Sequence, residues 1–224
     1  MGALQMRCTV VTNPENGSTI IIDGGAEPER LIAWIDEGKG RGPDWSSGEV
    51  SGLNREVVAL VNTHAHFDHS GHIPDLKDHY RVEWWLHPDD EFLQSLAQDS
   101  GRRWGFEVPS PARRDQDLEH GMELDFSGIK MKVIHTPGHT LGGCCLLIEV
   151  KGGPDHLIAG DTLFAGSVGR TDLPHSGGDF ELLSRMIRER LFTLDEDVVV
   201  HPGHGPLTTI GQEKLTNPFV GGHH

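Results

Sequence analysis

Four side chains of the kinds that bind metal ions fall within six residues of this chain. They are His64, His66, Asp68 and His69, and they follow the apolar segment 57–61, whose β-branched residues are typical of a buried strand. Because side chains alternate along an extended chain, His64 and His66 would leave the strand on one side and share an ion. Asp68 and His69, in the turn that follows, would reach a second ion. Single histidines are mostly surface residues, but this grouping favours a metal site.

Three later segments share one local design, in which an apolar strand ends in a turn with Gly or Pro and a ligand-type side chain. They are residues 133–139, 157–161 and 198–204, and their candidate ligands are His139, Asp161 and His204. A sheet fixes the end of each strand, and the turn exposes side chains and backbone there, so active sites commonly gather at strand ends. We therefore expect these turns to complete the site that the histidine run begins.

The order and spacing of these residues resemble the metallo-β-lactamase fold superfamily, whose pattern is H-x-H-x-D-H followed by a His, an Asp and a late His. The resemblance covers nearly the whole chain and implies two divalent metal ions. It implies that His64, His66 and His139 hold the first ion, that Asp68, His69 and His204 hold the second, and that Asp161 bridges them. It also implies that Asp23 supports the site by hydrogen bonding without binding metal.

The mixed set of imidazoles and carboxylates leads us to expect zinc, with iron or manganese as alternatives, because such a set is not selective. Two ions roughly 3.5 Å apart would activate a bridging hydroxide and polarise a carbonyl or phosphoryl oxygen. The expected reaction is hydrolysis, in which Asp68 orients the hydroxide. A G-x-S-x-G motif does not occur, and Cys144 and Cys145 have no base signature, so an acyl-enzyme route has no support.

Segments 161–174 and 202–219 resemble the small glyoxalase II-like hydrolases, which act on hydroxyacyl-glutathione thioesters such as S-lactoylglutathione, or on related thioesters. A thioester suits this chemistry because its carbonyl is electrophilic and its thiolate, with a pKa of about 8.5, leaves without a strong acid. Longer glyoxalase II enzymes carry a further helical segment that contacts glutathione, whereas 20 residues follow His204 here. Arg170 and Lys214 are the remaining candidates to bind a substrate carboxylate. Alternatively, Arg170 pairs with Asp172 and braces its loop.

Other reactions of the same superfamily stay open. A persulfide dioxygenase uses one iron held by two histidines and a carboxylate, and a lactonase or β-lactamase would keep the same two ions. The complete second set of ligands favours hydrolysis over the dioxygenase. His135 and His201 precede His139 and His204 by four and three residues. They are candidates to orient a ligand imidazole, with plain packing or exposure as the alternative.

The elements that must position these turns alternate along the chain. Segments 6–11 and 18–22 suit a hairpin joined at residues 13–17. Helical patterns are expected at 28–37, 73–79, 89–97 and 180–191, strands at 57–62, 82–86, 130–135, 144–150, 156–159 and 198–201, and irregular loops at 38–55 and 99–117. This layout predicts a layered α/β (α+β) sandwich, and the resemblance implies its four-layer αββα form.

Length and charge limit the remaining possibilities. The 224 residues suit one domain, 1–220, and residues 221–224 resemble a remnant of recombinant expression. The net charge of −15 argues against nucleic acid or an anionic membrane surface as a partner. No apolar run approaches the roughly 20 residues that span a bilayer, and the three cysteines suggest no disulfide framework. We therefore expect a cytoplasmic protein, and the resemblance implies that its partner is a small-molecule thioester; the sequence predicts no oligomeric state.

Overall fold

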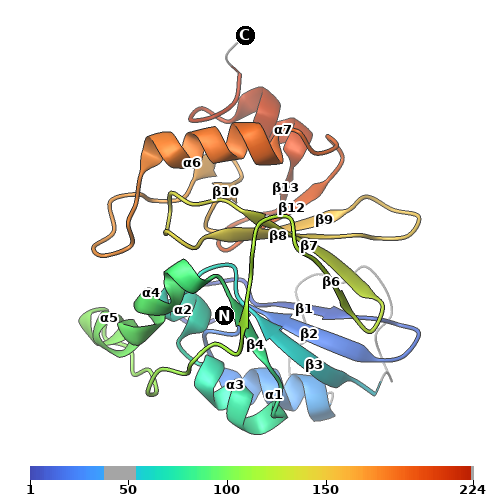
Figure 1. Ribbon diagram of the computed structural model, residues 1–224, viewed down its shortest axis with the longest axis vertical. Helices are drawn as coiled ribbons and strands as arrows, with labels where there is room; N and C mark the ends of the chain where they lie inside the picture. Colours follow the sequence, from blue (N-terminus) through green and yellow to red (C-terminus); the bar gives the residue numbers. More distant parts are fainter. Residues whose placement is uncertain (38–53, 223–224) are drawn as a thin grey trace.

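The computed structural model describes residues 1–37 and 54–222. In this part of the chain two β-sheets face each other, and helices cover the outer side of each sheet (Figure 1). The predicted four-layer αββα arrangement is confirmed. The loop expected at 38–55 lies almost entirely outside the described residues, as do the last two residues of the segment 221–224. None of the helices in the described ranges is long and apolar enough to cross a membrane.

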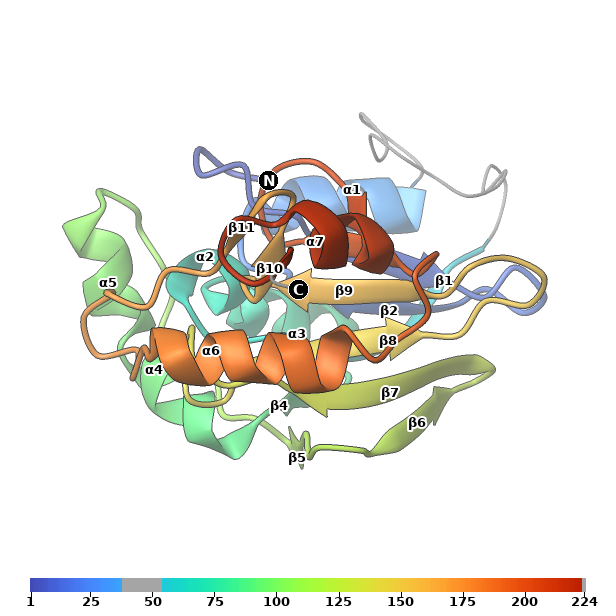
Figure 2. The ribbon, with the colours of Figure 1, turned by 90° about the horizontal axis from the view of Figure 1, so that it is seen from above.

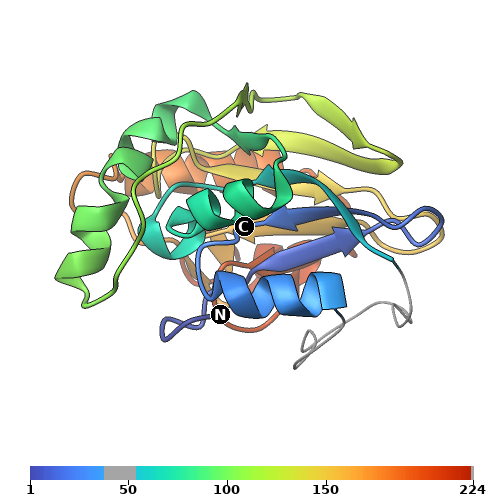
Figure 3. The same cartoon turned by 90° about the horizontal axis from the view of Figure 1, so that it is seen from below.

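The first sheet has the strand order β1-β2-β3-β4-β5. Its strands are β1 (Thr9–Thr12), β2 (Ser18–Ile22), β3 (Glu56–Val61), β4 (Trp84–Leu86) and β5 (Gln116–Asp117). β1 and β2 form the predicted hairpin, whereas β2 to β5 run parallel. Parallel neighbours need long crossover connections, and these contain α1 (Pro28–Glu37) and α3 (Ile73–Tyr80). Seen from below, both helices lie across the outer face of this sheet (Figure 3).

The second sheet has the strand order β13-β12-β9-β8-β7-β6. Its strands are β6 (Glu123–Phe126), β7 (Ile129–His135), β8 (Cys144–Ile148), β9 (His156–Gly160), β12 (Val199–Pro202) and β13 (Thr208–Thr209). Its outer face is covered by α6 (Phe180–Met186), which continues as the π-helical turn η2 (Ile187–Leu191), and by α7 (Ile210–Thr216). Figure 2, seen from above, shows α6 and α7 in front of the strands of this sheet.

The remaining elements are short and lie near the ends of the strands. They are α2 (Phe67–Ser70), the 3₁₀ turn η1 (Pro88–Asp90), α4 (Glu91–Ser95), α5 (Ala97–Arg103) and the hairpin of β10 (Leu163–Phe164) and β11 (Ser167–Val168). The single helix expected at 89–97 is thus broken, because Leu96 leaves helical geometry with φ −96° and ψ 0°. The expectation of a loop from residue 99 was wrong as far as Arg103, where α5 ends.

The strands fill three apolar layers because successive side chains point to opposite faces. Ile20 and Ile22 enter the layer between the two sheets, while Ile21 packs against the helices outside the first sheet. On β8, Cys144 belongs to the layer between the sheets and Cys145 to the layer under α6. Burying an aliphatic side chain of this size stabilises the fold by about 1.5–3 kcal/mol, so the alternation fixes which way each strand end points.

The turns that carry the predicted ligands meet at one end of the sandwich. The backbone N–H of Cys144 donates to the carbonyl of Thr63 at 2.8 Å, which joins the second sheet to the loop after β3. The N–H of Gly203 donates to the carbonyl of Gly160 at 2.7 Å and joins the turns after β12 and β9. The fold therefore brings all of these strand ends to one place.

Candidate metal centre

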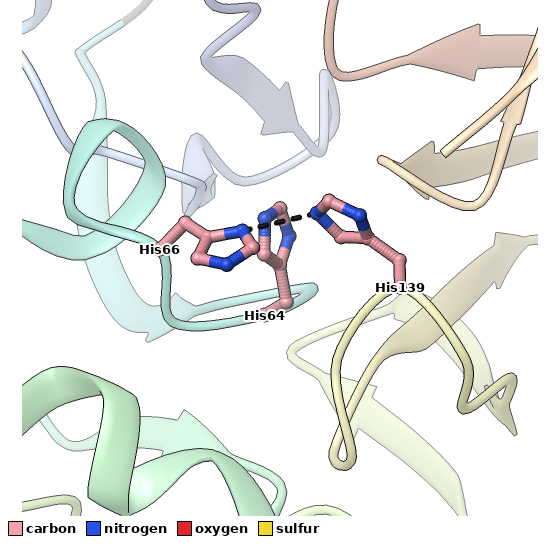
Figure 4. Close-up of side chains that lie close together, drawn as sticks. All are labelled: His64, His66 and His139. Carbon is pink, nitrogen blue, oxygen red and sulfur yellow. Dashed lines mark hydrogen bonds between the residues drawn. The ribbon is translucent and has the colours of Figure 1, made fainter. Parts of the chain in front are cut away.

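The three histidines that the resemblance assigns to the first ion lie together. His64 and His66 lie in the loop after β3, and His139 faces them from the turn between β7 and β8 (Figure 4). The ring centroids of His66 and His139 are 4.7 Å apart, and each lies 4.9 Å from that of His64. His139 Nε2 is 3.0 Å from His66 Nδ1, close to the roughly 3.4 Å between two ligands at about 2.1 Å from one tetrahedral zinc.

The second set combines α2 with the turn after β12. Asp68 and His69 lie on α2, where the sequence predicted a turn, and His204 approaches from the other sheet. His204 Nε2 is 3.3 Å from Asp68 Oδ2, and His69 Nε2 is 3.7 Å from the same oxygen. One donor atom from each residue lies within 4.8 Å of the other two. These three side chains can therefore hold a second ion.

Asp161, directly after β9, faces both sets. Its Oδ1 lies 3.4 Å from His69 Nε2, and its Oδ2 lies 3.6 Å from His139 Nε2. The same Oδ2 is 3.8 Å from His204 Nε2. Gly203 packs so closely here that an added Cβ would overlap the Asp161 carboxylate. Asp161 thus occupies the position that a carboxylate shared by two ions requires.

Hydrogen bonds on the outer side of the rings orient three of the imidazoles. The Nδ1–H of His139 donates to the carbonyl of Arg170 at 2.7 Å, that of His204 to the carbonyl of Leu4 at 3.0 Å, and that of His69 to Asp23 Oδ2 at 3.1 Å. A proton held on Nδ1 leaves the Nε2 lone pair directed into the cluster, which is how proteins commonly present histidine to a metal.

Asp23 is the centre of a buried hydrogen-bond network beneath the second set. Its Oδ1 accepts from the backbone N–H of Thr63 at 2.8 Å and from Asn62 Nδ2 at 3.1 Å. Its Oδ2 accepts from Thr63 Oγ1 at 2.7 Å in addition to His69. These contacts are those that the supporting role expected for Asp23 requires, and they lock the start of the histidine run.

Buried atoms of the cluster that lack a partner test whether a metal fits. Within the described residues, His64 Nε2, His69 Nε2 and Asp161 Oδ1 are buried and accept or donate no hydrogen bond. Leaving a buried polar atom unsatisfied costs about 1–3 kcal/mol. The same three residues can each direct one donor atom to a common point, since these atoms lie within 4.8 Å of one another. A bound cation would satisfy them, so the residues fit a metal centre.

The protonation of the two sets differs. Burial lowers the pKa of His66 to about 3 and that of His64 well below its ordinary value, so both imidazoles are neutral, the form that binds metal. At His69 burial acts in the same direction, but the carboxylates of Asp161 and Asp68 outweigh it and raise the pKa. At His204 the hydrogen bond to Asp68 raises the pKa. Protons therefore compete with an ion for the second set.

Two further histidines that the sequence singled out brace the surrounding strands. His135 Nε2 donates to the carbonyl of Leu141 at 2.9 Å, and its ring stacks on that of His87 with centroids 4.1 Å apart. This bond closes the turn that carries His139. His201 Nε2 lies 2.8 Å from His156 Nδ1 on the neighbouring strand.

The two basic candidates for substrate binding lie in different places. Arg170 borders the cluster through its carbonyl, while its guanidinium makes a bidentate pair with Asp172 at 2.9 and 3.0 Å. Lys214 Nζ is 3.5 Å from Glu196, which precedes β12, whereas His204 follows β12. The structure therefore keeps Arg170 near the cluster and does not bring Lys214 to it.

Sequence reasoning missed two side chains that hold the ligand turns. Arg7 donates from Nε to the carbonyl of Pro202 at 3.0 Å and from Nη2 to that of Gly205 at 2.6 Å, and so fixes the turn of His204. Asp90 accepts hydrogen bonds from the loops of the first set. Neither residue has a local sequence signal. Arg7 and Pro202 are 195 residues apart, and Asp90, which directly precedes a helix, has the sequence position of an ordinary helix N-cap.

Known proteins resemble the chain along nearly its whole length. Residues 1–204 match the model of the metallo-beta-lactamase superfamily, and the chain belongs to this superfamily. Hydroxyacylglutathione hydrolase GloC of Haemophilus influenzae is 35% identical over 220 residues, or 97% of this chain and 94% of that protein. The structure of TTHA1623 in a di-iron-bound form is 37% identical with a TM-score of 0.78, covering 98% of this chain and 97% of that one. The BLEG-1 B3 metallo-beta-lactamase is 32% identical with a TM-score of 0.82, covering 98% and 96%.

Proposed function

We propose that this member of the metallo-β-lactamase superfamily is a hydrolase with two divalent metal ions that cleaves thioesters of the hydroxyacyl-glutathione type, such as S-lactoylglutathione. The observation that carries the proposal is the pair of donor sets that Asp161 joins. When bound, two ions supply an activated water at neutral pH and an electrophile for the substrate carbonyl. We assign the first ion to His64, His66 and His139, and the second to Asp68, His69 and His204, with Asp161 shared.

Asp68 is the residue that we assign to orient the attacking water. Burial would raise its pKa, but His69 and the hydrogen bond to His204 lower it below its ordinary value. The carboxylate is therefore ionised and can accept a hydrogen bond from the attacking water. Its side chain is 16% exposed, so an incoming water can reach it.

The substrate class rests on the relatives and on the chemistry of the leaving group. The similar protein from Haemophilus influenzae is named a hydroxyacylglutathione hydrolase, and a thiolate leaves without a strong general acid. For the metal we propose zinc, with iron next, because TTHA1623 was solved with two irons. The name of BLEG-1 makes a β-lactam the necessary comparison substrate.

Arg170 is our candidate for contact with a glutathione carboxylate. Its pair with Asp172 is exposed on both sides, and exposed ion pairs contribute little to stability. The guanidinium can therefore exchange Asp172 for a substrate carboxylate at small cost and keep the bidentate geometry that arginine favours. Lys214 is left out of this proposal because its amine lies at the other end of β12.

The test is an assay of purified, metal-analysed protein with S-lactoylglutathione, a thioester without glutathione, a lactone and a β-lactam. Oxygen uptake with glutathione persulfide tests the dioxygenase alternative. We expect thioester hydrolysis by protein with two ions, and loss of it in Asp161→Asn. Asp155→Asn, at the opposite end of β9, is the matched control and should keep full activity. Two bound ions without thioester turnover, or oxygen uptake by protein with one iron, would overturn the proposal.

A further inference from the structure

Asp90 is a fully buried acid next to the first set of ligands. It lies where η1 ends and α4 begins, a position at which an Asp side chain usually accepts a hydrogen bond from the first turn of the helix. Among the described residues, α4 donates no such bond to the Asp90 side chain. Because burying a carboxylate is costly unless hydrogen bonds replace its water, its other contacts must account for its presence.

The donors to Asp90 come from two loops of different sheets. The backbone N–H of Ala65, in the loop after β3, donates to Oδ2 at 3.0 Å. From the β7–β8 turn, Thr140 Oγ1 donates to the same oxygen at 2.9 Å, and the N–H of Gly142 donates to Oδ1 at 2.6 Å. One carboxylate therefore ties the two loops to each other.

These loops carry the three histidines that we assign to the first ion. Ala65 stands between His64 and His66, and Thr140 directly follows His139. The ion must therefore be held by side chains from both sheets, and their spacing depends on the distance between the two loops. Hydrogen bonds at this point fix the distance between the loops before an ion binds, so that binding does not have to order the loops.

The β7–β8 turn packs closely against Asp90. A Cβ at Gly142 would lie 2.8 Å from both the backbone nitrogen and Oδ1 of Asp90, so this turn approaches the acid as closely as glycine permits. Two of its three donors are backbone groups, which fixes the loop backbones themselves and not only their side chains.

We infer that Asp90 is a positioning residue for the first metal ion, which it serves by holding the loop of His64 and His66 at a fixed distance from the turn of His139. The inference rests on the proposed two-metal function. Asp90 acts through the backbones on either side and contacts no ligand ring in the hydrogen bonds that tie it.

Asp90→Asn tests the inference with little change of shape. The amide NH₂ group must replace one of the two carboxylate oxygens. It then faces either the N–H of Gly142 or the donors of Ala65 and Thr140, so at least one hydrogen bond between the loops and residue 90 is lost. We expect zinc affinity of the first site, measured by competition with a chromogenic chelator, to fall about 10–100-fold, the usual effect of removing a group that supports a ligand. Asp89→Asn is the matched control, because Asp89 is adjacent in sequence and its side chain is 61% exposed. The zinc affinity of this variant should equal that of the parent protein.

The outcomes separate the inference from the proposed function. A parent protein that binds no metal contradicts the proposed function. If the parent protein binds two ions and folded Asp90→Asn binds zinc at the first site with the same affinity, the positioning role is overturned. A residue that only stabilises the fold would lower the melting temperature of the variant without changing the zinc affinity of the folded protein. If Asp90→Asn does not fold, Thr140→Val removes one donor and keeps the side-chain shape. It should give a smaller loss of affinity, and no loss would overturn the inference.

Discussion

Removing the ions should destabilise the protein strongly, because the metal centre contains buried atoms that only a cation satisfies in our assignment. His64 Nε2, His69 Nε2 and Asp161 Oδ1 are buried and lack hydrogen-bond partners among the described residues. Each such atom costs about 1–3 kcal/mol when it is left unpaired. His69 Nε2 and Asp161 Oδ1 lie 3.4 Å apart and can pair with each other when His69 is protonated. Metal removal should therefore lower the free energy of unfolding by roughly 1–9 kcal/mol, from one atom at its smallest cost to three at their largest.

The lower end of this range is the better expectation. Asp161 is 14% exposed, so water can reach part of its carboxylate once the ions leave. For a chain of this size, each kcal/mol corresponds to about 2–4 °C in the melting temperature. A loss of about 3 kcal/mol then corresponds to a decrease of roughly 6–12 °C.

The assay compares thermal unfolding, followed by circular dichroism, of zinc-loaded protein with that of protein dialysed against EDTA. EDTA saturated with calcium is the control for effects of the chelator itself, and readdition of zinc should restore the original melting temperature. Metal analysis accompanies each sample. An unchanged melting temperature in protein shown to have lost its ions would refute the reasoning that these three atoms require a cation.

Three further predictions follow from the same geometry. Asp161→Ala should lose at least one of two ions and all turnover, because the shared carboxylate screens two like charges from each other; retention of both ions on metal analysis would show that another residue bridges them. The second ion should bind more weakly at pH 6 than at pH 8, and the affinity for the first ion should change less. The reason is that His69 and His204 have raised pKa values and hold protons that the second ion must displace. Zinc titrations in which both affinities fall equally would contradict this. Arg170→Ala should raise KM for S-lactoylglutathione severalfold at unchanged metal content, whereas Asp172→Ala should not; an equal rise in both variants would identify the pair as a loop brace.

The long, regular elements could be predicted from the sequence, and the short ones could not. α1 has the predicted bounds because its apolar residues repeat with helical spacing and bury one face. β2 also has its predicted bounds. The two-residue strands β10, β11 and β13 contain no measurable period. α5 was missed because Gly101 and two arginines gave residues 97–103 the composition of a loop.

The candidate ligands could be predicted because each is a metal-binding residue type in a turn at the end of an apolar strand, a pattern that the local sequence contains. The structure brings His64, His66, His139, Asp68, His69, Asp161 and His204 into three overlapping donor groups. What holds these turns could not be predicted, since Asp90 joins loops 25 and 52 residues away. Lys214 shows the converse, because its place in the resembling segment 202–219 says nothing about which end of β12 its side chain reaches.

The distribution of buried acids favours two ions over one in the proposed site. Asp23, Asp90 and Asp161 lie within or directly beneath the cluster, and Asp68 lines its mouth. Together these four carboxylates carry as much negative charge as two divalent cations carry positive charge. With a single divalent ion, the other half of this charge would be left to protons on His69 and His204, whose pKa values the neighbouring carboxylates raise, and a second ion would replace those protons. The acids that lie outside both donor sets thus add to the affinity for the second ion while they fix the loops that bind the first.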